Sequence, residues 1–420
     1  MSSSGRLKSF FLGLFALLAS FAVLELGARV AESFSHDVKK APDADDREWS
    51  VFTPDRGWAL RPGYRGKVGG YDRVFDADGF LAVDSRQIKD PAAKRIMFIG
   101  DSNMFGVGTP TNSSFVELVD SLVPGVAAIN LAVPGYTSFQ GRRVLDKYLP
   151  VIHPAMVVVS FNFNDKKYAL PQLGHDSNES LLNIYRSSNT GMRDLRKNLE
   201  YSHLVVVLRK MLQSARLLPR PPESIRVDTM QIRVDPERYR ENLRYMADKA
   251  TKSGARVIFL ILRDNPLYTR PITAGIAQLD SGQYENAIAN LRFAVHEDNG
   301  FSDVGRIYLA RAYRAIGEST AAENALISTS VQTTIFGGRP LHLDSEYNDI
   351  MRQVASETGA EIVDASSVLM SHANDFTDYC HFDAAAHHRV GHLLADKITE
   401  MLQPAERPHG APVARAGQKL

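Results

Sequence analysis

The sequence predicts a three-layer α/β domain with about five parallel strands. Short apolar runs rich in β-branched residues recur along the chain, and segments with amphipathic helical spacing separate them. Such alternation is typical of a parallel sheet covered by helices on both faces. The composition agrees, because 420 residues with 44% hydrophobic and 23% charged side chains can form one large or two ordinary cores.

The predicted strands and helices alternate through most of the chain. Strands are expected at residues 95–100, 126–133, 155–161, 256–262 and 361–366, and helices at residues 113–122, 138–149, 236–253, 341–358 and 384–402. Ligands of open parallel sheets bind beyond the carboxyl ends of the strands. We therefore expect the functional residues of this chain at that edge of the sheet.

The first thirty residues predict a membrane anchor or an export signal. Arg6 and Lys8 precede the charge-free run 9–24, SFFLGLFALLASFAVL. The run is shorter than the roughly 20 residues of a spanning helix, so a cleaved signal peptide is the alternative. We favour an uncleaved anchor, because no A-x-A cleavage site stands near the end of the run. Basic residues before the segment predict a periplasmic or cell-surface location for the rest of the chain, secreted if cleavage occurs.

Composition shifts divide the remaining chain. Charged residues without apolar periodicity predict a polar tether, and glycines interspersed with aromatic residues predict a small β-rich lead-in after it. The expected parts are an anchor or signal at 1–30, the tether at 31–49, the lead-in at 50–90, the α/β domain at 91–271 and 331–404, an insertion within it at 166–235, a helical insert at 272–330 and a disordered tail at 405–420.

The helical insert carries a weak internal repeat. Its period predicts paired helical hairpins and resembles tetratricopeptide repeats, in which small residues let helices pack closely. Such repeats offer a groove to a protein partner, and a structural insert that leans on the α/β domain is the alternative. The repeated residues, at an offset of 35, are Ala277, Gly282, Ala287 and Leu291 followed by Ala312, Gly317, Ala322 and Leu326.

Several classes of partner and cofactor are not indicated. A net charge of +1, from 49 Lys and Arg against 48 Asp and Glu, gives no basic field for nucleic acid. The single cysteine, Cys380, allows neither an internal disulfide nor a multi-cysteine metal site, and we expect it to be a packing residue. No phosphate-binding loop follows a strand. His387, His388 and His392 lie on the last predicted helix without other ligands, so we expect a solvated face and neither metal nor cofactor.

Residues able to carry out chemistry follow the predicted strands. Ser102, in the motif GDS, follows the first strand and is either a nucleophile or a helix cap. Gly135 follows the second strand and Asn164 the third, where an N–H and a side-chain amide can meet a developing oxyanion. Near the C-terminus Asp378 precedes His381 by three residues, a spacing that lets the carboxylate orient the imidazole. Each feature alone is common in proteins.

In this order and spacing the four blocks resemble those of the SGNH hydrolases, also called the GDSL esterase/lipase superfamily. The resemblance covers about residues 94–165 and 256–402, roughly half of the chain, and the N-terminal segment is similar to that of membrane-anchored bacterial members. The sequence departs from the family pattern in reading GDSN instead of GDSL, and in carrying Asn162 and Asp383 where glycine and asparagine are frequent.

The resemblance implies a flavodoxin-like sheet and a role for each block. Ser102 is the implied nucleophile, His381 its base and Asp378 the residue that orients the base. The Ser102 N–H, the Gly135 N–H and the Asn164 side chain are the implied oxyanion hole. The implied activity is a carboxylic ester hydrolase that needs no cofactor or metal.

The location predicts the substrate class. An enzyme outside the cytoplasmic membrane meets O-acetylated polysaccharide or another O-acylated envelope carbohydrate, and lipid esters are the next expectation. The first alternative is an O-acyltransferase of exopolysaccharide assembly that uses the same triad. The second is a scaffold without catalysis that binds a protein partner through residues 272–330.

Overall fold

The computed structural model describes most of the chain beyond the N-terminal segment. The described residues are 20, 23–25, 27, 48–81, 90–170, 173–188, 203–215, 217–218, 224–297, 300–329, 337–369 and 375–403. The tail predicted at 405–420, nearly all of the segment 1–30 and all but the last two residues of the tether 31–49 lie outside them. No helix in the described part of the chain is long and apolar enough to cross a membrane.

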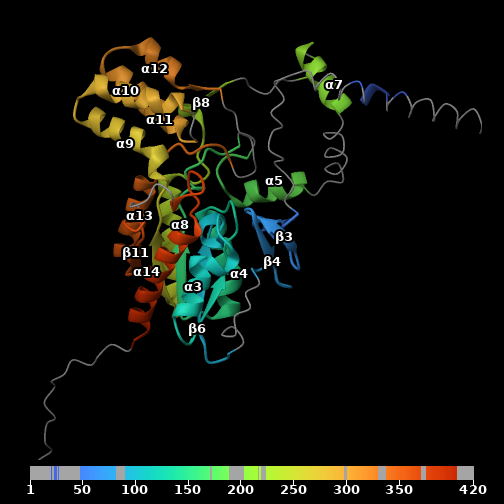
Figure 1. The fold of residues 1–420 in the computed structure, drawn as a ribbon, viewed down its shortest axis with the longest axis vertical. Coiled ribbons are helices and arrows are strands. Elements are labelled where there is room, and N and C mark those ends of the chain that lie inside the picture. The colour runs from blue at the N-terminus through green and yellow to red at the C-terminus, as the bar shows by residue number, and fades with distance from the viewer. Residues whose placement is uncertain are drawn as a thin grey trace, which may run out of the picture.

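A five-stranded parallel sheet forms the centre of the molecule (Figure 1). Its order is β6-β5-β7-β9-β11, which is 2-1-3-4-5 in chain order and therefore that of flavodoxin-like folds. The predicted fold class is confirmed. The strands are β5 (Lys94–Gly100), β6 (Val126–Asn130), β7 (Met156–Ser160), β9 (Arg256–Ile261) and β11 (Glu361–Asp364).

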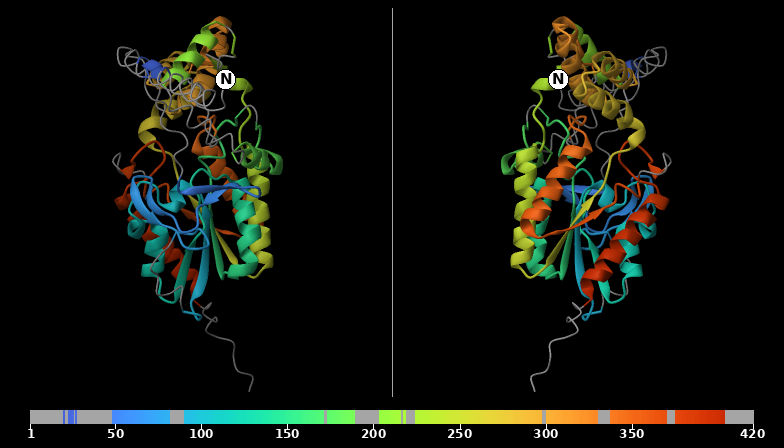
Figure 2. Two further views of the ribbon diagram at one scale, coloured as in Figure 1. Left: turned by 90° about the vertical axis from the view of Figure 1, so that its right-hand side faces the viewer. Right: turned by 90° about the vertical axis from the view of Figure 1, so that its left-hand side faces the viewer.

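Helices cover both faces of this sheet (Figure 2). On one face α3 (Phe115–Leu122) packs against α14 (Ala384–Leu402). On the other, α8 (Pro236–Lys252) lies between α4 (Ser138–Ile152) and α13 (Asp344–Thr358). The middle strand β7 is buried along its whole length, which explains its continuous apolar sequence MVVVS.

The strand predicted at 126–133 ends three residues early, and the reason lies in its last residue. Strand β6 was expected to continue to residue 133 but stops at Asn130. The Asn130 side chain accepts a hydrogen bond from the Ala132 N–H at 3.1 Å and donates one to the Met104 carbonyl, also at 3.1 Å. An asparagine that bonds its own backbone two residues on starts a turn, so residues 131–137 leave the sheet as a loop.

Two antiparallel ribbons precede the sheet. Strand β1 (Ser50–Thr53) pairs with β2 (Gly57–Leu60), and β3 (Arg65–Val68) pairs with β4 (Tyr71–Val74). They lie outside the five-stranded sheet, but Trp58, Leu60, Val68 and Phe75 belong to the same hydrophobic core. The ribbons are therefore packed firmly onto the α/β domain.

The predicted helical insert is present as four helices above the sheet (Figure 1). They are α9 (Pro266–Asp280), α10 (Tyr284–His296), α11 (Ser302–Ala315) and α12 (Ser319–Ala325), and each packs on the next. Leu291 and Leu326, which are equivalent in the repeat, are both buried in a second hydrophobic core. Helix α9 begins before the predicted boundary, because Asn265 caps it and Pro266 occupies its first turn.

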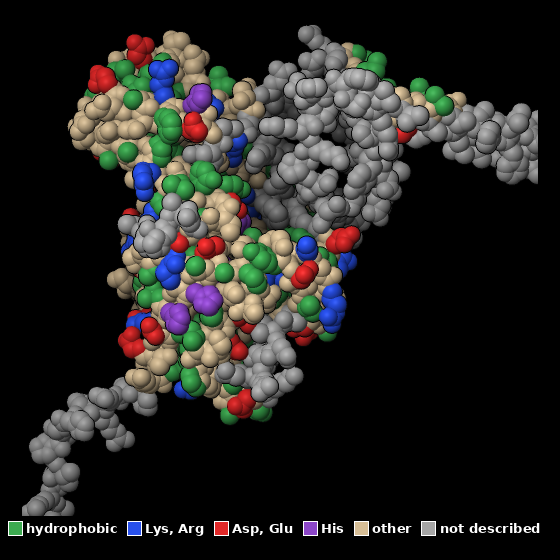
Figure 3. Space-filling model, in the orientation of Figure 1, with side chains coloured by type: hydrophobic (Ala, Val, Ile, Leu, Met, Phe, Trp, Pro, Cys, Tyr) green, Lys and Arg blue, Asp and Glu red, His purple; other side chains and the backbone are tan. Residues whose placement is uncertain are grey.

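Shorter elements complete the described chain. They are α2 (Ser102–Phe105), α5 (Asn178–Ser188), α7 (His203–Ser214), the two-residue strands β8 (Ile225–Arg226) and β10 (Ile327–Ser328), and two single 3-10 turns at Thr111–Ser113 and Val227–Thr229. On the face seen in Figure 3, positive and negative side chains of the described residues are interspersed and form no large patch of one sign.

Candidate active site

The nucleophile block forms a tight turn at the carboxyl end of β5. Asp101, and not Ser102, is the N-cap of α2: its Oδ1 accepts a hydrogen bond from the Asn103 N–H at 3.0 Å. Ser102 is the first residue of the helix, and its hydroxyl is thus not needed as a cap. Gly100 permits the turn, because a Cβ there would lie 2.7 Å from the Met104 Cβ and 2.8 Å from the Ser160 carbonyl oxygen.

The structure brings Ser102, His381 and Asp378 into one hydrogen-bonded chain. The His381 Nε2 lies 2.8 Å from the Ser102 Oγ, and the His381 Nδ1 lies 2.6 Å from the Asp378 Oδ2. A carboxylate can only accept, so Nδ1 carries the proton and Nε2 is left to accept from the serine hydroxyl. The serine and the histidine are 279 positions apart in the chain, and the fold brings them together.

The Asp378 carboxylate is fixed on both oxygens. Its Oδ1 accepts hydrogen bonds from the Cys380 and His381 N–H groups, both at 2.8 Å. Partial burial acts to raise the pKa of Asp378, but its hydrogen bond and charge interaction with His381 and these two N–H groups outweigh burial and lower the pKa to about 2. The group therefore stays ionised and can stabilise an imidazolium at His381.

Three donors for an oxyanion were expected around Ser102. In the described part of the chain neither the Ser102 N–H nor the Gly135 N–H donates to a protein acceptor. Gly135 has φ +85°, a left-handed conformation that favours glycine. The Asn164 Nδ2 donates to the Asp101 Oδ2 at 3.3 Å, which places this buried amide beside the nucleophile turn with a second N–H to offer.

The loop that carries Gly135, residues 134–137, is here called the oxyanion loop. The Trp58 indole donates to the Pro134 carbonyl at 3.2 Å, and the Tyr136 hydroxyl donates back to the Trp58 carbonyl. From another direction Arg233 donates to the Gly135 carbonyl at 3.0 Å. Trp58 is 76 positions from Pro134 in the chain, and Arg233 is 98 positions from Gly135. No local sequence pattern therefore predicts these contacts.

Arg233 is itself held in a buried network. Its guanidinium pairs with Asp176 at 2.8 Å and donates to the Gln140 side chain at 3.1 Å. The side chains of Arg233 and Asp176 are only 3% and 8% exposed. A buried, multiply bonded arginine is a rigid donor, so we expect it to fix the position of the oxyanion loop.

A second buried arginine holds the segment after the nucleophile. Arg73, from strand β4, donates to the Gly106 and Thr109 carbonyls at 2.6 Å each and to the Thr111 hydroxyl at 2.5 Å. Its side chain stacks near Phe105, the last residue of α2. The lead-in thus contacts both the nucleophile segment and the oxyanion loop.

Residues 375–383, here called the base loop, carry Asp378 and His381. The loop closes on itself through a bridge between Phe376 and Phe382. Asn265, the cap of α9, donates its side-chain amide to the Asp378 carbonyl at 2.9 Å and its N–H to the Tyr379 carbonyl at 3.0 Å. Cys380 is buried in the second core, as a packing residue should be.

Two buried carboxyl groups flank the site. Burial raises the pKa of Asp101 to about 6, although the Asn103 N–H, His381 and Asn164 act in the opposite direction. Asp165 accepts from the Ser138 N–H at 2.9 Å and from the Ser138 hydroxyl at 2.5 Å at the start of α4. Burial raises the pKa of Asp165 to about 8 despite those bonds.

Asp378, Cys380 and His381 are also close enough together to be considered as metal ligands. Burial raises the pKa of the Cys380 thiol, and the Asp378 charge adds to this effect, so the sulfur is not a thiolate at neutral pH. The His381 Nδ1 is bonded to Asp378. The three residues therefore fit a hydrogen-bonded pair beside a packing cysteine better than a metal site.

One histidine expected on a solvated face is buried. His387 is fully enclosed and stacks on Phe115, with ring centres 5.2 Å apart. Burial lowers the pKa of His387 to about 3, so it is a neutral core residue. His388 and His392 are exposed, as expected. The prediction was wrong for His387 because helix α14 turns that position towards α3.

No protein-family model and no curated protein matches the sequence. Solved structures that resemble the chain include a lipase/acylhydrolase from Enterococcus faecalis, at 15% identity and a TM-score of 0.37, with 75% of this chain and 100% of that chain covered. A mutant of the acetylxylan esterase Axe2 from Geobacillus stearothermophilus shares 14% identity at a TM-score of 0.35, with 74% and 96% covered. The esterase EstA from Pseudoalteromonas sp. shares 13% at a TM-score of 0.33, with 74% and 98% covered. These scores are too low to support a function, which must be inferred from the site itself.

Proposed function

We propose that the protein is a serine ester hydrolase of the SGNH type. The observation that carries the proposal is the His381 imidazole placed between the Ser102 hydroxyl at 2.8 Å and the Asp378 carboxylate at 2.6 Å. An unassisted hydroxyl is a weak nucleophile at neutral pH, and this arrangement supplies both the base and the group that orients it.

The proposed reaction proceeds through an acyl-enzyme. His381 takes the proton of Ser102 as the oxygen attacks the ester carbonyl, and then gives that proton to the leaving alcohol. The N–H groups of Ser102 and Gly135 and the Asn164 amide stabilise the oxyanion. Water, deprotonated by His381, releases the acid and restores Ser102. The chain's own residues account for every proton transfer in this sequence.

A serine-directed fluorophosphonate probe tests the nucleophile. The wild-type protein should be labelled and Ser102→Ala should not, whereas Ser121→Ala, at an exposed position on α3, should be labelled like the wild type. Hydrolysis of 4-nitrophenyl acetate should fall by at least about 10³-fold in Ser102→Ala. Labelling that persists in Ser102→Ala would place the reactive nucleophile at another residue, and no labelling of the wild type would favour a scaffold; either result would contradict the proposal.

Product analysis separates hydrolysis from transfer. Incubation of the full-length protein with an acyl donor and an acetyl-free oligosaccharide should yield free acid, with the oligosaccharide mass unchanged. An acylated oligosaccharide that disappears in His381→Ala would instead establish the O-acyltransferase.

We further propose an extracytoplasmic location, with an O-acylated envelope carbohydrate as substrate. The support is the basic, then apolar, N-terminal segment, which orients the following chain outwards and leaves it anchored unless a signal peptidase removes the segment. Protease added to intact spheroplasts should degrade residues after 50 and spare a cytoplasmic control protein. Protection of the chain from protease until lysis would contradict this location.

A further inference from the structure

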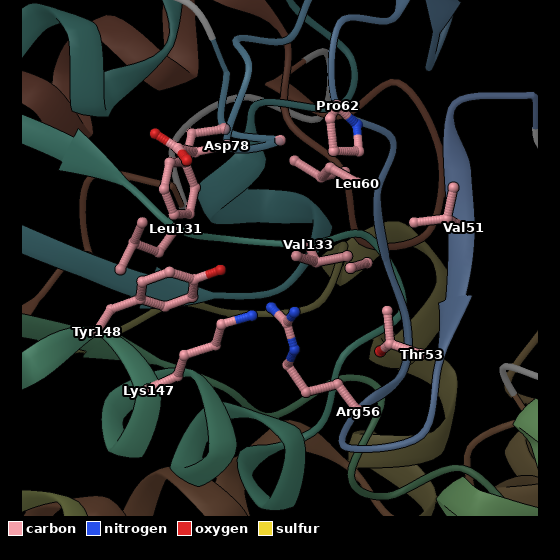
Figure 4. Close-up of a pocket in the computed structure, with 13 residues that line it drawn as sticks. Val51, Thr53, Arg56, Leu60, Pro62, Asp78, Leu131, Val133, Lys147 and Tyr148 are labelled. Atoms are coloured by element: carbon pink, nitrogen blue, oxygen red, sulfur yellow. The ribbon is translucent and has the colours of Figure 1, made fainter.

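A pocket of about 210 Å3 lies apart from the triad, between the first ribbon and the α/β domain (Figure 4). Strands β1 and β2 form one wall, and helix α4 and the residues after β6 form the other. No residue of the triad lines it. Much of its surface is apolar, contributed by Val51, Ala59, Leu60, Phe80, Leu131 and Val133.

Positive charge gathers at one end of this pocket. Figure 4 shows the terminal nitrogens of Arg56 and the ammonium of Lys147 pointing towards each other from opposite walls, with the Tyr148 hydroxyl beside them. The Arg56 guanidinium carbon and the Lys147 Nζ lie 5.8 and 5.3 Å from the centre of the Tyr148 ring. Three groups able to donate hydrogen bonds therefore share one corner.

The negative charge near this corner comes from Asp55, which interacts with both Arg56 and Lys147. The Arg56 side chain is only 7% exposed, and it meets Asp55 through Nε alone, at 3.1 Å. Lys147 forms no ion pair with any carboxylate among the described residues. Asp78, the other acidic residue of the lining, stands at the opposite end in Figure 4 and is exposed to solvent. Two cations thus share one carboxylate that is itself 46% exposed, so the corner keeps a surplus of positive charge that an anionic ligand would balance.

We propose that this pocket binds the carboxylate of a small organic acid with a short apolar body. The carboxylate lies between Arg56 and Lys147, where the guanidinium fork fits it and the Tyr148 hydroxyl donates a further hydrogen bond. The apolar body packs against the aliphatic and aromatic lining. The volume of about 210 Å3 suits an acid of a few carbons.

Calorimetric titration of the full-length protein with hexanoate tests the proposal. Wild-type protein should bind hexanoate, and Lys147→Gln should weaken that binding about tenfold, since a charge-assisted hydrogen bond is lost. Lys147 is exposed, so its replacement should not affect folding. Lys252→Gln, at an exposed position at the end of α8, is the matched control and should bind like the wild type.

Two further ligands test separately whether binding needs the apolar body and whether it needs the negative charge. Inorganic phosphate, which lacks an apolar body, and 1-hexanol, which lacks the charge, should each bind at least about tenfold more weakly than hexanoate. Binding of hexanoate should weaken as the salt concentration rises. No binding of hexanoate, equal binding by Lys147→Gln, or equal binding of phosphate or hexanol would overturn the proposal. None of these outcomes depends on ester hydrolysis.

Discussion

The oxyanion loop and the base loop are held in different ways. Buried side chains from distant segments hold the oxyanion loop: the Trp58 indole, and Arg233 with its carboxylate partner Asp176. Neutral bonds from Asn265, the second hydrophobic core and one ion pair, between Asp375 and Arg389 at 2.5 Å, hold the base loop. A charged network responds strongly to the loss of one member, whereas neutral bonds are individually weak. Replacement of Arg233 in the oxyanion loop's network should therefore have a larger effect than replacement of Asn265, which supports the base loop through neutral bonds.

The lead-in and the helical insert contact different parts of the site. The lead-in reaches the oxyanion loop through Trp58 and the nucleophile segment through Arg73. The helical insert reaches the base loop through Asn265, at its first helix, and through the core that encloses Cys380. A bond between His381 and Ser102 thus joins parts of the site that two different segments support.

The largest effect is expected for Arg233→Met. It leaves the Asp176 carboxylate buried without its partner, and the loss of one member of a buried pair lowers the free energy of unfolding by about 3–5 kcal/mol. The Gly135 carbonyl loses its donor, so the oxyanion loop shifts and kcat for 4-nitrophenyl acetate falls by about 10²-fold. Chemical denaturation and steady-state kinetics measure the two effects.

Arg238→Met is the matched control for that experiment. Arg238 pairs with Asp235 at 3.2 Å on the surface, and its side chain is 46% exposed. An exposed pair contributes about 0–1 kcal/mol, so stability and kcat should change little. If Arg233→Met lowered stability and left kcat unchanged in the folded fraction, Arg233 would be a stabilising residue without a positioning role.

A smaller effect is expected when the support of the base loop is altered. Asn265→Ala removes the donor to the Asp378 carbonyl and the cap of α9, whose loss lowers the free energy of unfolding by about 1–2 kcal/mol. Asn265→Ser keeps an oxygen that can cap α9, adds no charge at a position that is only 3% exposed, and is too short to donate to the Asp378 carbonyl. We therefore expect Asn265→Ser to retain more stability than Asn265→Ala, while kcat falls several-fold in both.

That pair of variants separates capping from loop positioning. If Asn265→Ser had the kcat of the wild type, the bond to the Asp378 carbonyl would have no part in placing the base. If both variants lost equal stability, the cap would not be the stabilising interaction.

The elements that the sequence predicted are those whose signal is local. Buried strands appear as apolar runs, and the triad residues stand at strand ends or in a short D-x-x-H block, so their positions follow from the fold. The partners of the oxyanion loop were missed because Trp58 and Arg233 bond to backbone carbonyls, and a carbonyl has the same chemistry at every residue. The early start of α9 had a local signal in Asn265 followed by proline, a capping pattern that was overlooked.

A smaller change in the opposite direction is expected at Asn103, beside the nucleophile. Its side chain is buried and its Oδ1 accepts no hydrogen bond in the described part of the chain. Unlike Arg233 and Asn265, it supports neither loop through a side-chain bond. Asn103→Leu removes a buried amide whose oxygen is unsatisfied, so thermal denaturation should show a gain of about 1 kcal/mol in the free energy of unfolding. Asn103→Ala, which removes the amide but leaves a cavity, should be less stable than Asn103→Leu.

If Asn103→Leu kept its stability but had a lower kcat, the Asn103 amide would have a role in catalysis. Such a result would show that the unpaired oxygen is used during the reaction.

The smallest expected effect is on the pH dependence of stability, to which Asp378 and Asp101 contribute in opposite directions. The lowered pKa of Asp378, about 2, means that the folded protein binds fewer protons there than the unfolded chain between about pH 4 and pH 2. Its contribution to stability is present above about pH 4 and is lost as the pH falls through that window. Asp101, with its pKa raised by burial to about 6, acts in the opposite sense and lowers stability as the pH rises from about 4 to 6.

Denaturation midpoints from pH 5 to pH 2 test the Asp378 contribution. The wild type should lose more stability over this range than Asp378→Asn, and Asp349→Asn, at an exposed surface position, should follow the wild type. The difference should be modest, because the Asp378 side chain is 39% exposed and solvent screens its interaction with His381. Parallel curves for the wild type and Asp378→Asn would mean that the His381 bond does not favour the ionised carboxylate, and that the base loop lacks the charge needed to stabilise an imidazolium.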